Sequence, residues 1–261
     1  MLKEYSEDIV RVGVDEVVVS IDTVEDDTYS RFRMGSVSDV IMGLYELYRV
    51  RKKYNSPLIL GLAFTVTTLN YSELPGIVKL ANSVKAVYIN LSNIIPVSEK
   101  MIQYACFMSE NCRKEIKRYL NMVSRLALEY PIRIYKVNFT LKAQRTCSFM
   151  AENALFMGWD GKLSPCLHYG HNYYTYLFSL KRRIYRIVFG DINRENLMSV
   201  WFKRDYHLFR YIAKTGYLPS CLDCDIAEYC IITKDNMMDC WGNSPTCAHC
   251  PFMYGLTACP L

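Results

Sequence analysis

The residues best suited to chemistry in this sequence are cysteines, and most of them lie near its C-terminal end. Seven of the eleven cysteines fall between Cys221 and Leu261. Two more, Cys147 and Cys166, stand further upstream. In a chain without an export signal, clustered cysteines are more often metal ligands or redox groups than structural disulfides. We therefore expect these thiols to bind metal.

The spacing of the cysteines narrows the kind of metal site. From Cys221 the pattern is C-x2-C-x5-C-x9-C-x6-C-x2-C-x8-C. Two C-x2-C pairs lie close to zinc-ribbon separation, so zinc stays open as an alternative. The candidate thiolates exceed the four of one ribbon, and close cysteine runs also bind iron–sulfur clusters. We favour iron–sulfur clusters, with these candidate ligands: Cys147, Cys166, Cys221, Cys224, Cys230, Cys240, Cys247, Cys250 and Cys259.

Two other cysteines and one histidine are weaker candidates. Cys106 and Cys112 are six residues apart in a region expected to be helical, which places them on different helix faces. We interpret them as small buried hydrophobic residues, so that Cys106→Ser should be nearly silent. His249 lies within Cys-Ala-His-Cys and could donate a hydrogen bond to a cluster sulfur.

A hairpin and a helix are expected around the upstream cysteines. Asp160-Gly161 is a two-residue turn signal between the extended stretches 154–159 and 162–166. Such a hairpin returns the chain toward its start and can bring Cys147 and Cys166 together. Apolar residues at helical spacing predict a helix over 195–211.

The N-terminal part alternates between strands and helices. Apolar runs predict strands at 14–22, 58–66, 84–91 and 132–137, separated by helical stretches at 39–53, 73–84 and 97–129. This alternation predicts an α/β fold with parallel strands. Four strands are too few for an eight-stranded barrel. The first strand is apolar enough to need neighbours on both edges, so either the sheet is small and open or a partner or missing N-terminal half completes it.

The segments VGVDEVVVSIDTVEDDTYSRFR and NYSELPGIVKLANSVKAVYINLSNIIP resemble the second half of a radical SAM barrel. The resemblance implies that Ser20 and Asp22 touch S-adenosylmethionine, with Arg33 a weaker candidate. Ser and Asp after a strand are also ordinary turn residues. The family holds its catalytic cluster with a C-x-x-x-C-x-x-C loop, and that spacing does not occur in this sequence. This polypeptide alone should not cleave S-adenosylmethionine.

The cysteine-rich part resembles the SPASM domain, which holds auxiliary 4Fe-4S clusters in radical SAM maturases. C-x13-G-x4-C fits the opening of that domain and C-x2-C-x5-C fits its middle, whereas the x9 gap before Cys240 departs from it. The tail DCWGNSPTCAHCPFMYGLTACP is similar to the radical SAM group described as modifying the cofactor of tungsten-dependent aldehyde oxidoreductases. The resemblance implies one cluster on Cys147, Cys166 and Cys240, and another on Cys221, Cys224, Cys230 and Cys259. Cys247 and Cys250 fit neither pattern and could replace any of the last ligands.

The sequence therefore predicts an α/β protein: a partial parallel β/α barrel at 1–140, followed by a small α+β cysteine-rich SPASM-type domain at 145–261. We expect the auxiliary-cluster part of a maturase acting on a peptide or cofactor. A substrate related to a tungsten or molybdenum enzyme is the narrower alternative. A complementing radical SAM chain would supply S-adenosylmethionine chemistry, which leaves open whether this chain is itself an enzyme. A zinc-stabilised binding module and an inactive truncated remnant are the alternatives.

Charge and hydropathy set the remaining expectations. The formal net charge of +5 is spread through short runs, which favours a solvated surface over nucleic-acid binding. No window reaches the roughly eighteen apolar residues of a membrane span, and the N-terminus lacks the apolar core of a signal peptide. We expect a cytoplasmic protein that binds neither nucleic acid nor membrane.

Overall fold

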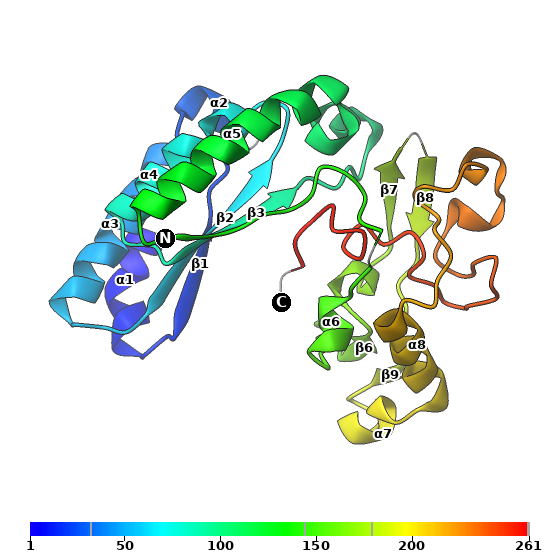
Figure 1. Ribbon diagram of the computed structural model, residues 1–261. Helices are drawn as coiled ribbons and strands as arrows, with labels where there is room; N and C mark the ends of the chain where they lie inside the picture. Colours follow the sequence, from blue (N-terminus) through cyan, green and yellow to red (C-terminus); the bar gives the residue numbers. More distant parts are fainter. Residues whose placement is uncertain (32, 144, 179, 260–261) are drawn as a thin grey trace. The chain divides into compact units, whose positions relative to one another are not determined.

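The computed structural model describes residues 1–31, 33–143, 145–178 and 180–259. The chain divides into two compact units. Unit 1 comprises residues 1–94 and 103–137, and unit 2 comprises residues 95–102 and 138–261. The mixed α/β fold class predicted from the sequence is confirmed, with a parallel sheet in unit 1 and the cysteine-rich segment in unit 2 (Figure 1).

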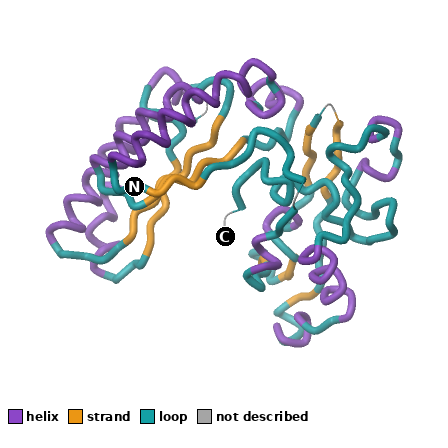
Figure 2. The backbone as a smooth tube through the Cα atoms, in the orientation of Figure 1, coloured by secondary structure: helices purple, strands orange, loops and turns teal. Residues whose placement is uncertain are grey.

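Unit 1 is built on a four-stranded parallel sheet (Figure 2). Its strands are β1 (Glu16–Ser20), β2 (Ile59–Val66), β3 (Tyr88–Asn93) and β4 (Arg133–Tyr135), and they pair in that order. In register, Val18 lies opposite Gly61, and Gly61 lies opposite Tyr88. All four strands that the sequence predicts are present and parallel.

Burial along the strands differs from the expectation for the first one. Leu60, Leu62 and Phe64 of β2 are fully buried, as expected for a central strand. β1 alternates between exposed and half-buried residues, and Val18 is 50% exposed. Among the described strands β1 pairs only with β2, so it lies at the edge of the sheet and is not buried on both faces.

The helices of unit 1 lie along one side of the sheet in Figures 1 and 2. Ser36 caps the main helix by accepting a hydrogen bond from the Ser38 N–H, so the helix begins slightly before the predicted start. None of the described helices could cross a membrane, because none combines the necessary length with an apolar composition. The helices are α1 (Leu2–Arg11), α2 (Asp26–Ser30), α3 (Val37–Lys53), α4 (Leu74–Ser83) and α5 (Glu110–Glu129).

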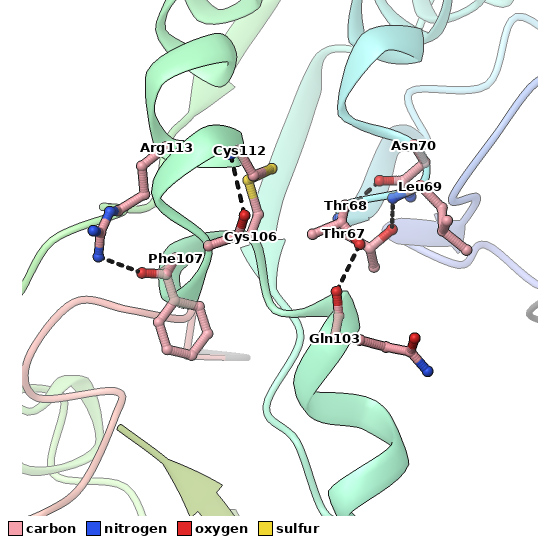
Figure 3. Close-up of a disulfide and its surroundings, with 10 residues drawn as sticks. Thr67, Thr68, Leu69, Asn70, Gln103, Cys106, Phe107, Cys112 and Arg113 are labelled. Carbon is pink, nitrogen blue, oxygen red and sulfur yellow. Dashed lines mark hydrogen bonds between the residues drawn. A yellow bond between two sulfur atoms is a disulfide. The ribbon is translucent and has the colours of Figure 1, made fainter. Parts of the chain in front are cut away.

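The segment before α5 corrects the interpretation of Cys106 and Cys112. The sequence predicts either a long helix or a helical pair over 97–129. The chain instead forms the 3-10 helices η2 (Glu99–Tyr104) and η3 (Cys106–Met108) before α5. The Ser109 hydroxyl accepts a hydrogen bond from the Cys112 N–H and caps α5, so Cys106 lies outside that helix. The two cysteines form a disulfide (Figure 3). The expectation that they occupy different helix faces is therefore wrong.

Unit 2 contains two small antiparallel sheets and short helices. The predicted Asp160-Gly161 hairpin is present, with Gly161 at a positive φ of 76°. The predicted helix at 195–211 is instead two helices that meet at Phe202-Lys203. The elements are α6 (Ser148–Ala151), β5 (Phe156–Met157), β6 (Lys162–Ser164), η4 (Leu167–Tyr169), β7 (Tyr173–Leu177), β8 (Leu180–Ile184), β9 (Gly190–Asp191), α7 (Leu197–Trp201), α8 (Arg204–Thr215), η5 (Ala227–Tyr229) and η6 (Ile232–Lys234).

The core of unit 2 combines aromatic residues with cysteines. Tyr169 is fully buried, packs edge-on against Phe209, and donates its hydroxyl proton to the Thr246 carbonyl at 2.6 Å. Cys221, Cys247 and Cys250 are buried in the same core. The cysteines are thus held by the main apolar packing of the unit, because the aromatic residues around them leave little freedom to move.

Candidate metal centre

Four cysteines from separate stretches of the chain line one cavity in unit 2. Cys147 precedes α6, Cys166 ends the β5–β6 hairpin, and Cys250 and Cys259 come from the C-terminal segment. The cavity measures about 30 Å³, room for about two water molecules. We call these four residues the cavity cysteines: Cys147, Cys166, Cys250 and Cys259.

Backbone hydrogen bonds bring the C-terminal segment to this cavity. The Asn138 N–H donates to the Gly255 carbonyl at 3.0 Å, and the Lys142 N–H donates to the Tyr254 carbonyl at 3.0 Å. The stretch that leads into Cys147 therefore runs beside the stretch that leads to Cys259. These contacts explain why Cys259 lies with Cys147 and Cys166, and not with Cys221 as the family resemblance implied.

Burial favours the neutral form of three of the cavity cysteines, Cys147, Cys166 and Cys250. Desolvation raises the pKa of Cys166 to about 12 and raises the pKa of Cys147 and Cys250. Backbone N–H groups two and three residues further along favour the thiolate at each of these three positions. Each of the three sulfurs therefore precedes a turn whose N–H groups point the right way to stabilise a metal-bound thiolate.

A second set of cysteines gathers where the chain enters its C-terminal loops. Burial first, then the thiol of Cys240 and the carboxylate of Asp239, raise the pKa of Cys221 to about 12. Cys224 also raises the pKa of Cys221. Cys221 and Cys230 both oppose the lowering of the Arg182 pKa that burial causes. We call this set the loop cysteines: Cys221, Cys224, Cys230 and Cys240.

A hydrogen-bonded carboxylate fixes the loop that carries Cys240. Asp239 is buried, and its side chain accepts hydrogen bonds from the Trp241 and Asn243 N–H groups, the Asn243 amide and the Thr246 hydroxyl. The Asn243 amide also donates to the Tyr217 carbonyl at 3.1 Å. This contact ties the loop to the stretch just before Cys221 and explains why Cys240 lies with Cys221.

The ninth free cysteine and two histidines lie between or beside these sets. Cys247 is buried, and burial is the main cause of its raised pKa. The nearby thiols of Cys250, Cys166 and Cys147 raise that pKa further. His168 lines the cavity and shares a hydrogen bond through Nδ1 with the Tyr173 hydroxyl, and its Nε2 has no partner in the described part of the chain. His249 donates from Nε2 to the Asp235 carbonyl at 2.7 Å.

Burial decides the protonation of both histidines. It lowers the pKa of His168 to about 3 and that of His249 to about 4. Both imidazoles are therefore neutral at neutral pH, and neither supplies a positive charge to the cysteines. The prediction that His249 assists a cluster stays a prediction.

As they stand, the thiols are not gathered around one ion. Within residues 1–31, 33–143, 145–178 and 180–259, no three His, Cys, Asp or Glu side chains form a group that could hold a single metal ion. The donor chemistry nevertheless fits iron–sulfur clusters, because each set supplies four thiols, the number a 4Fe-4S cluster uses. Binding would require these side chains to move outward and lose their protons.

The predicted S-adenosylmethionine residues come together in unit 1. The Arg33 guanidinium donates to the Asp22 carboxylate at 2.6 Å and to the Ser20 hydroxyl at 2.9 Å. Asp22 also accepts a hydrogen bond from the Thr65 N–H at 2.8 Å, which ties the end of β1 to β2. Their role toward S-adenosylmethionine remains a prediction.

Sequence reasoning missed Asn70, which positions Asp22. Its amide donates to the carbonyls of Asp22 and Thr65, and its side-chain oxygen accepts from the Thr67 N–H. Asn70 is fully buried, so it fixes the backbone at the carboxyl ends of β1 and β2. An asparagine shortly after an apolar strand was the available signal, and it resembles an ordinary turn residue.

Comparison with known proteins gives a consistent result. Residues 147–225 match the SPASM model, described as an iron-sulfur cluster-binding domain. The chain is 28% identical over 265 aligned residues to the tungsten-containing aldehyde ferredoxin oxidoreductase cofactor-modifying protein of Pyrococcus furiosus. That alignment covers 100% of this chain and 72% of the relative.

Solved structures show the same fold at low sequence identity. SuiB of Streptococcus suis bound to S-adenosylmethionine matches with a TM-score of 0.52 and 12% identity, over 82% of this chain and 48% of SuiB. SuiB bound to the precursor peptide SuiA matches with a TM-score of 0.50 and 11% identity, over the same shares. The chain thus spans about half the length of SuiB. Together these findings confirm that the chain resembles the radical SAM proteins that carry a SPASM domain.

Proposed function

We propose that unit 2 binds auxiliary 4Fe-4S clusters and that the chain is the auxiliary-cluster part of a radical SAM maturase. The observation that carries the proposal is the cavity lined by Cys147, Cys166, Cys250 and Cys259, which come from distant stretches of the chain. Thiols with no metal to bind gain nothing from such convergence, since burial alone keeps them protonated and unpaired. The match of residues 147–225 to an iron-sulfur cluster-binding domain supports the same role.

The proposed ligands follow the two sets of cysteines. The cavity cysteines would hold one cluster and the loop cysteines the other, with Cys247 as an extra thiol beside the first. A bound cluster supplies one-electron transfer. The chain itself lines the cavity with the apolar side chains of Phe149, Leu167 and Phe252, which lower the polarity around the proposed cluster.

The proposed role of unit 1 is to hold S-adenosylmethionine together with a complementing segment. Ser20 and Asp22 lie at the carboxyl end of β1, where ligands bind in parallel α/β sheets. β1 has a free edge among the described strands, and an added strand could pair there. The complementing segment would carry the C-x-x-x-C-x-x-C loop that this sequence lacks.

The proposed substrate is a peptide or a cofactor. The Pyrococcus furiosus relative is described as a cofactor-modifying protein, and SuiB has been solved with a precursor peptide. A substrate related to a tungsten or molybdenum enzyme is the narrower possibility that the first of these names supports.

Metal and sulfide content test the proposal directly. Protein purified without oxygen should be brown and contain about eight iron and eight sulfide per chain, the content of two 4Fe-4S clusters. Double replacement of Cys106 and Cys112 by serine is a matched control that should leave iron content unchanged. Stoichiometric zinc with no absorbance near about 400 nm would overturn the cluster assignment.

The enzymatic part of the proposal has a separate test. Reduced protein incubated alone with S-adenosylmethionine should form no 5′-deoxyadenosine above background. Addition of a polypeptide carrying the missing barrel half should allow turnover, and Asp22→Asn should reduce that turnover. Turnover by the lone chain would mean that some of the cysteines assigned to auxiliary clusters hold the catalytic one.

A further inference from the structure

Arg182 is a buried cation in the middle of unit 2. It belongs to β8 and is 1% exposed, and it is among the largest fully buried side chains of the described residues. Arginine is almost never fully buried unless it is paired. A charge placed this deep must have a compensating partner, because desolvation of an unpaired ion is strongly unfavourable.

The hydrogen bonds of Arg182 do not satisfy its charge. Nη1 donates to the Leu177 carbonyl at 3.4 Å and Nη2 donates to the Cys221 carbonyl at 3.5 Å, both near the limit for a hydrogen bond. Its Nε has no partner within the described part of the chain. Among the described residues, the guanidinium therefore has a donor without a partner as well as two weak hydrogen bonds, one of them to Cys221.

Within the described part of the chain, no carboxylate forms an ion pair with Arg182. The ion pairs found among the described residues all involve other basic groups. The ionisable side chains whose anionic forms would favour its charge are those of Cys221, Tyr254 and Cys230. Of these three, the two cysteines belong to the loop cysteines, and the Cys221 carbonyl also accepts a hydrogen bond from Nη2.

Neutral thiols cannot compensate a cation, whereas metal-bound thiolates can. Four thiolates around a 4Fe-4S core carry about two negative charges in total, and about three after uptake of one electron. Four thiolates around zinc also leave about two. The compensating charge is therefore present when the loop cysteines hold a metal and absent when they do not.

We propose that the guanidinium of Arg182 is the buried counter-ion of a negatively charged metal–thiolate group held by Cys221, Cys224, Cys230 and Cys240. This assignment rests on the proposed function, and it deepens it by distinguishing the two clusters. The lining residues that the structure describes for the cavity of the other set include no arginine or lysine. A nearby cation favours the more negative, reduced form, so Arg182 raises the reduction potential of the loop-cysteine cluster more than that of the other cluster.

The test compares three full-length variants purified without oxygen. Arg182→Met removes the charge at similar length, and Arg182→Lys keeps it. Arg183→Met is the matched control, because Arg183 is the next residue on β8 and is exposed. Two quantities are measured for each variant: the iron content and the reduction potential of each cluster. The potentials are obtained by EPR during titration with dithionite in the presence of mediators.

Arg182→Met should lower the potential of one of the two clusters by at least about 59 mV, a tenfold change in the one-electron equilibrium constant. Loss of only that cluster's iron in Arg182→Met, with iron retained in Arg182→Lys, would also support the assignment. Arg183→Met should change neither property. The assignment is overturned if Arg182→Met keeps all its iron and both potentials, or if Arg182→Lys is damaged as severely as Arg182→Met.

Failure of the proposed function would be recognised separately. If the wild-type protein contains no iron, the cluster assignment fails, and the counter-ion role is then tested with cobalt alone. Cobalt(II) titrated into the reduced, metal-free protein should bind about 10- to 100-fold more weakly in Arg182→Met than in Arg183→Met. Equal cobalt affinity in the two variants would overturn the counter-ion role.

Discussion

Replacement of Asp239 by alanine should destabilise unit 2 strongly, because one carboxylate accepts four hydrogen bonds in the loop between Cys240 and Cys247. Three of these bonds lie in buried surroundings, and they come from the Asn243 N–H, the Asn243 amide and the Thr246 hydroxyl. Each buried donor left without an acceptor costs about 1–2 kcal/mol. The expected loss from the three donors is therefore about 3–6 kcal/mol.

Thermal unfolding of the metal-loaded protein, followed by circular dichroism, measures this loss. For a unit of this size the midpoint should fall by about 10 °C or more. Asp235→Ala is a matched control in the same segment, since the Asp235 side chain is only half-buried and accepts one backbone hydrogen bond, from Met237. That variant should stay within about 2 °C of wild type.

The iron content of the Asp239 variant links stability to function. If the loop positions Cys240, Asp239→Ala should lose iron from the loop cysteines and keep the iron of the cavity cysteines. A midpoint shift below about 3 °C would refute the reasoning, because it would mean that the four donors find other partners at no cost.

Two further predictions concern covalent and electrostatic contacts. Replacement of both Cys106 and Cys112 by serine should lower the free energy of unfolding by about 2 kcal/mol in denaturant titrations, because the six-residue separation closes a short loop; equal stability of variant and wild type under oxidising conditions would contradict the disulfide. The Arg186 guanidinium holds the pKa of Asp160 well below its ordinary value through two hydrogen bonds of 2.6 and 2.7 Å. Because the folded-state pKa is depressed, this contact contributes stability above about pH 4, the ordinary aspartate pKa, and the contribution falls away as the pH drops below it. The difference in thermal midpoint between wild type and Asp160→Asn should therefore be constant above about pH 5 and shrink below about pH 4, and a difference that grows on acidification would rule this out.

The sheet was predictable because its strands are marked by continuous apolar runs. Leu60, Leu62 and Phe64 share one face of β2, and that face is fully buried, as the apolar residues at every second position predict. Helix α1 was not predicted, because its stretch is mostly polar. It forms through contact with α3, where Leu2 lies so close to Gly43 that a Cβ there would approach it to 3.1 Å. Such a contact depends on tertiary packing, which local sequence does not encode.

The set of candidate ligands was easier to predict than its division. The thiols stand out by number and spacing, but their grouping depends on contacts between distant stretches. The placement of Cys259 follows from backbone bonds between residues 138–142 and 254–255, and that of Cys240 from the Asn243–Tyr217 contact. A family spacing pattern carries neither contact, because the x9 gap before Cys240 changes the path of the chain.

The disulfide was not predicted, because the helix boundary before Cys112 was not recognised. The interpretation of Cys106 and Cys112 assumed one continuous helix through both residues. Ser109 instead caps α5, so the chain turns between them and brings the two sulfurs together. The serine was a recognisable capping signal, and it would have placed Cys106 outside the helix.

The central claim is that two separate sets of four cysteines hold two clusters, and iron content in paired alanine variants tests it most directly. Cys147→Ala combined with Cys259→Ala should retain about four iron per chain, because both residues belong to the cavity set and only one cluster is lost. Cys147→Ala combined with Cys221→Ala should retain almost none, because each set then lacks a ligand. The division would be contradicted if the Cys147 and Cys259 pair lost all iron while Cys221→Ala combined with Cys259→Ala retained about four.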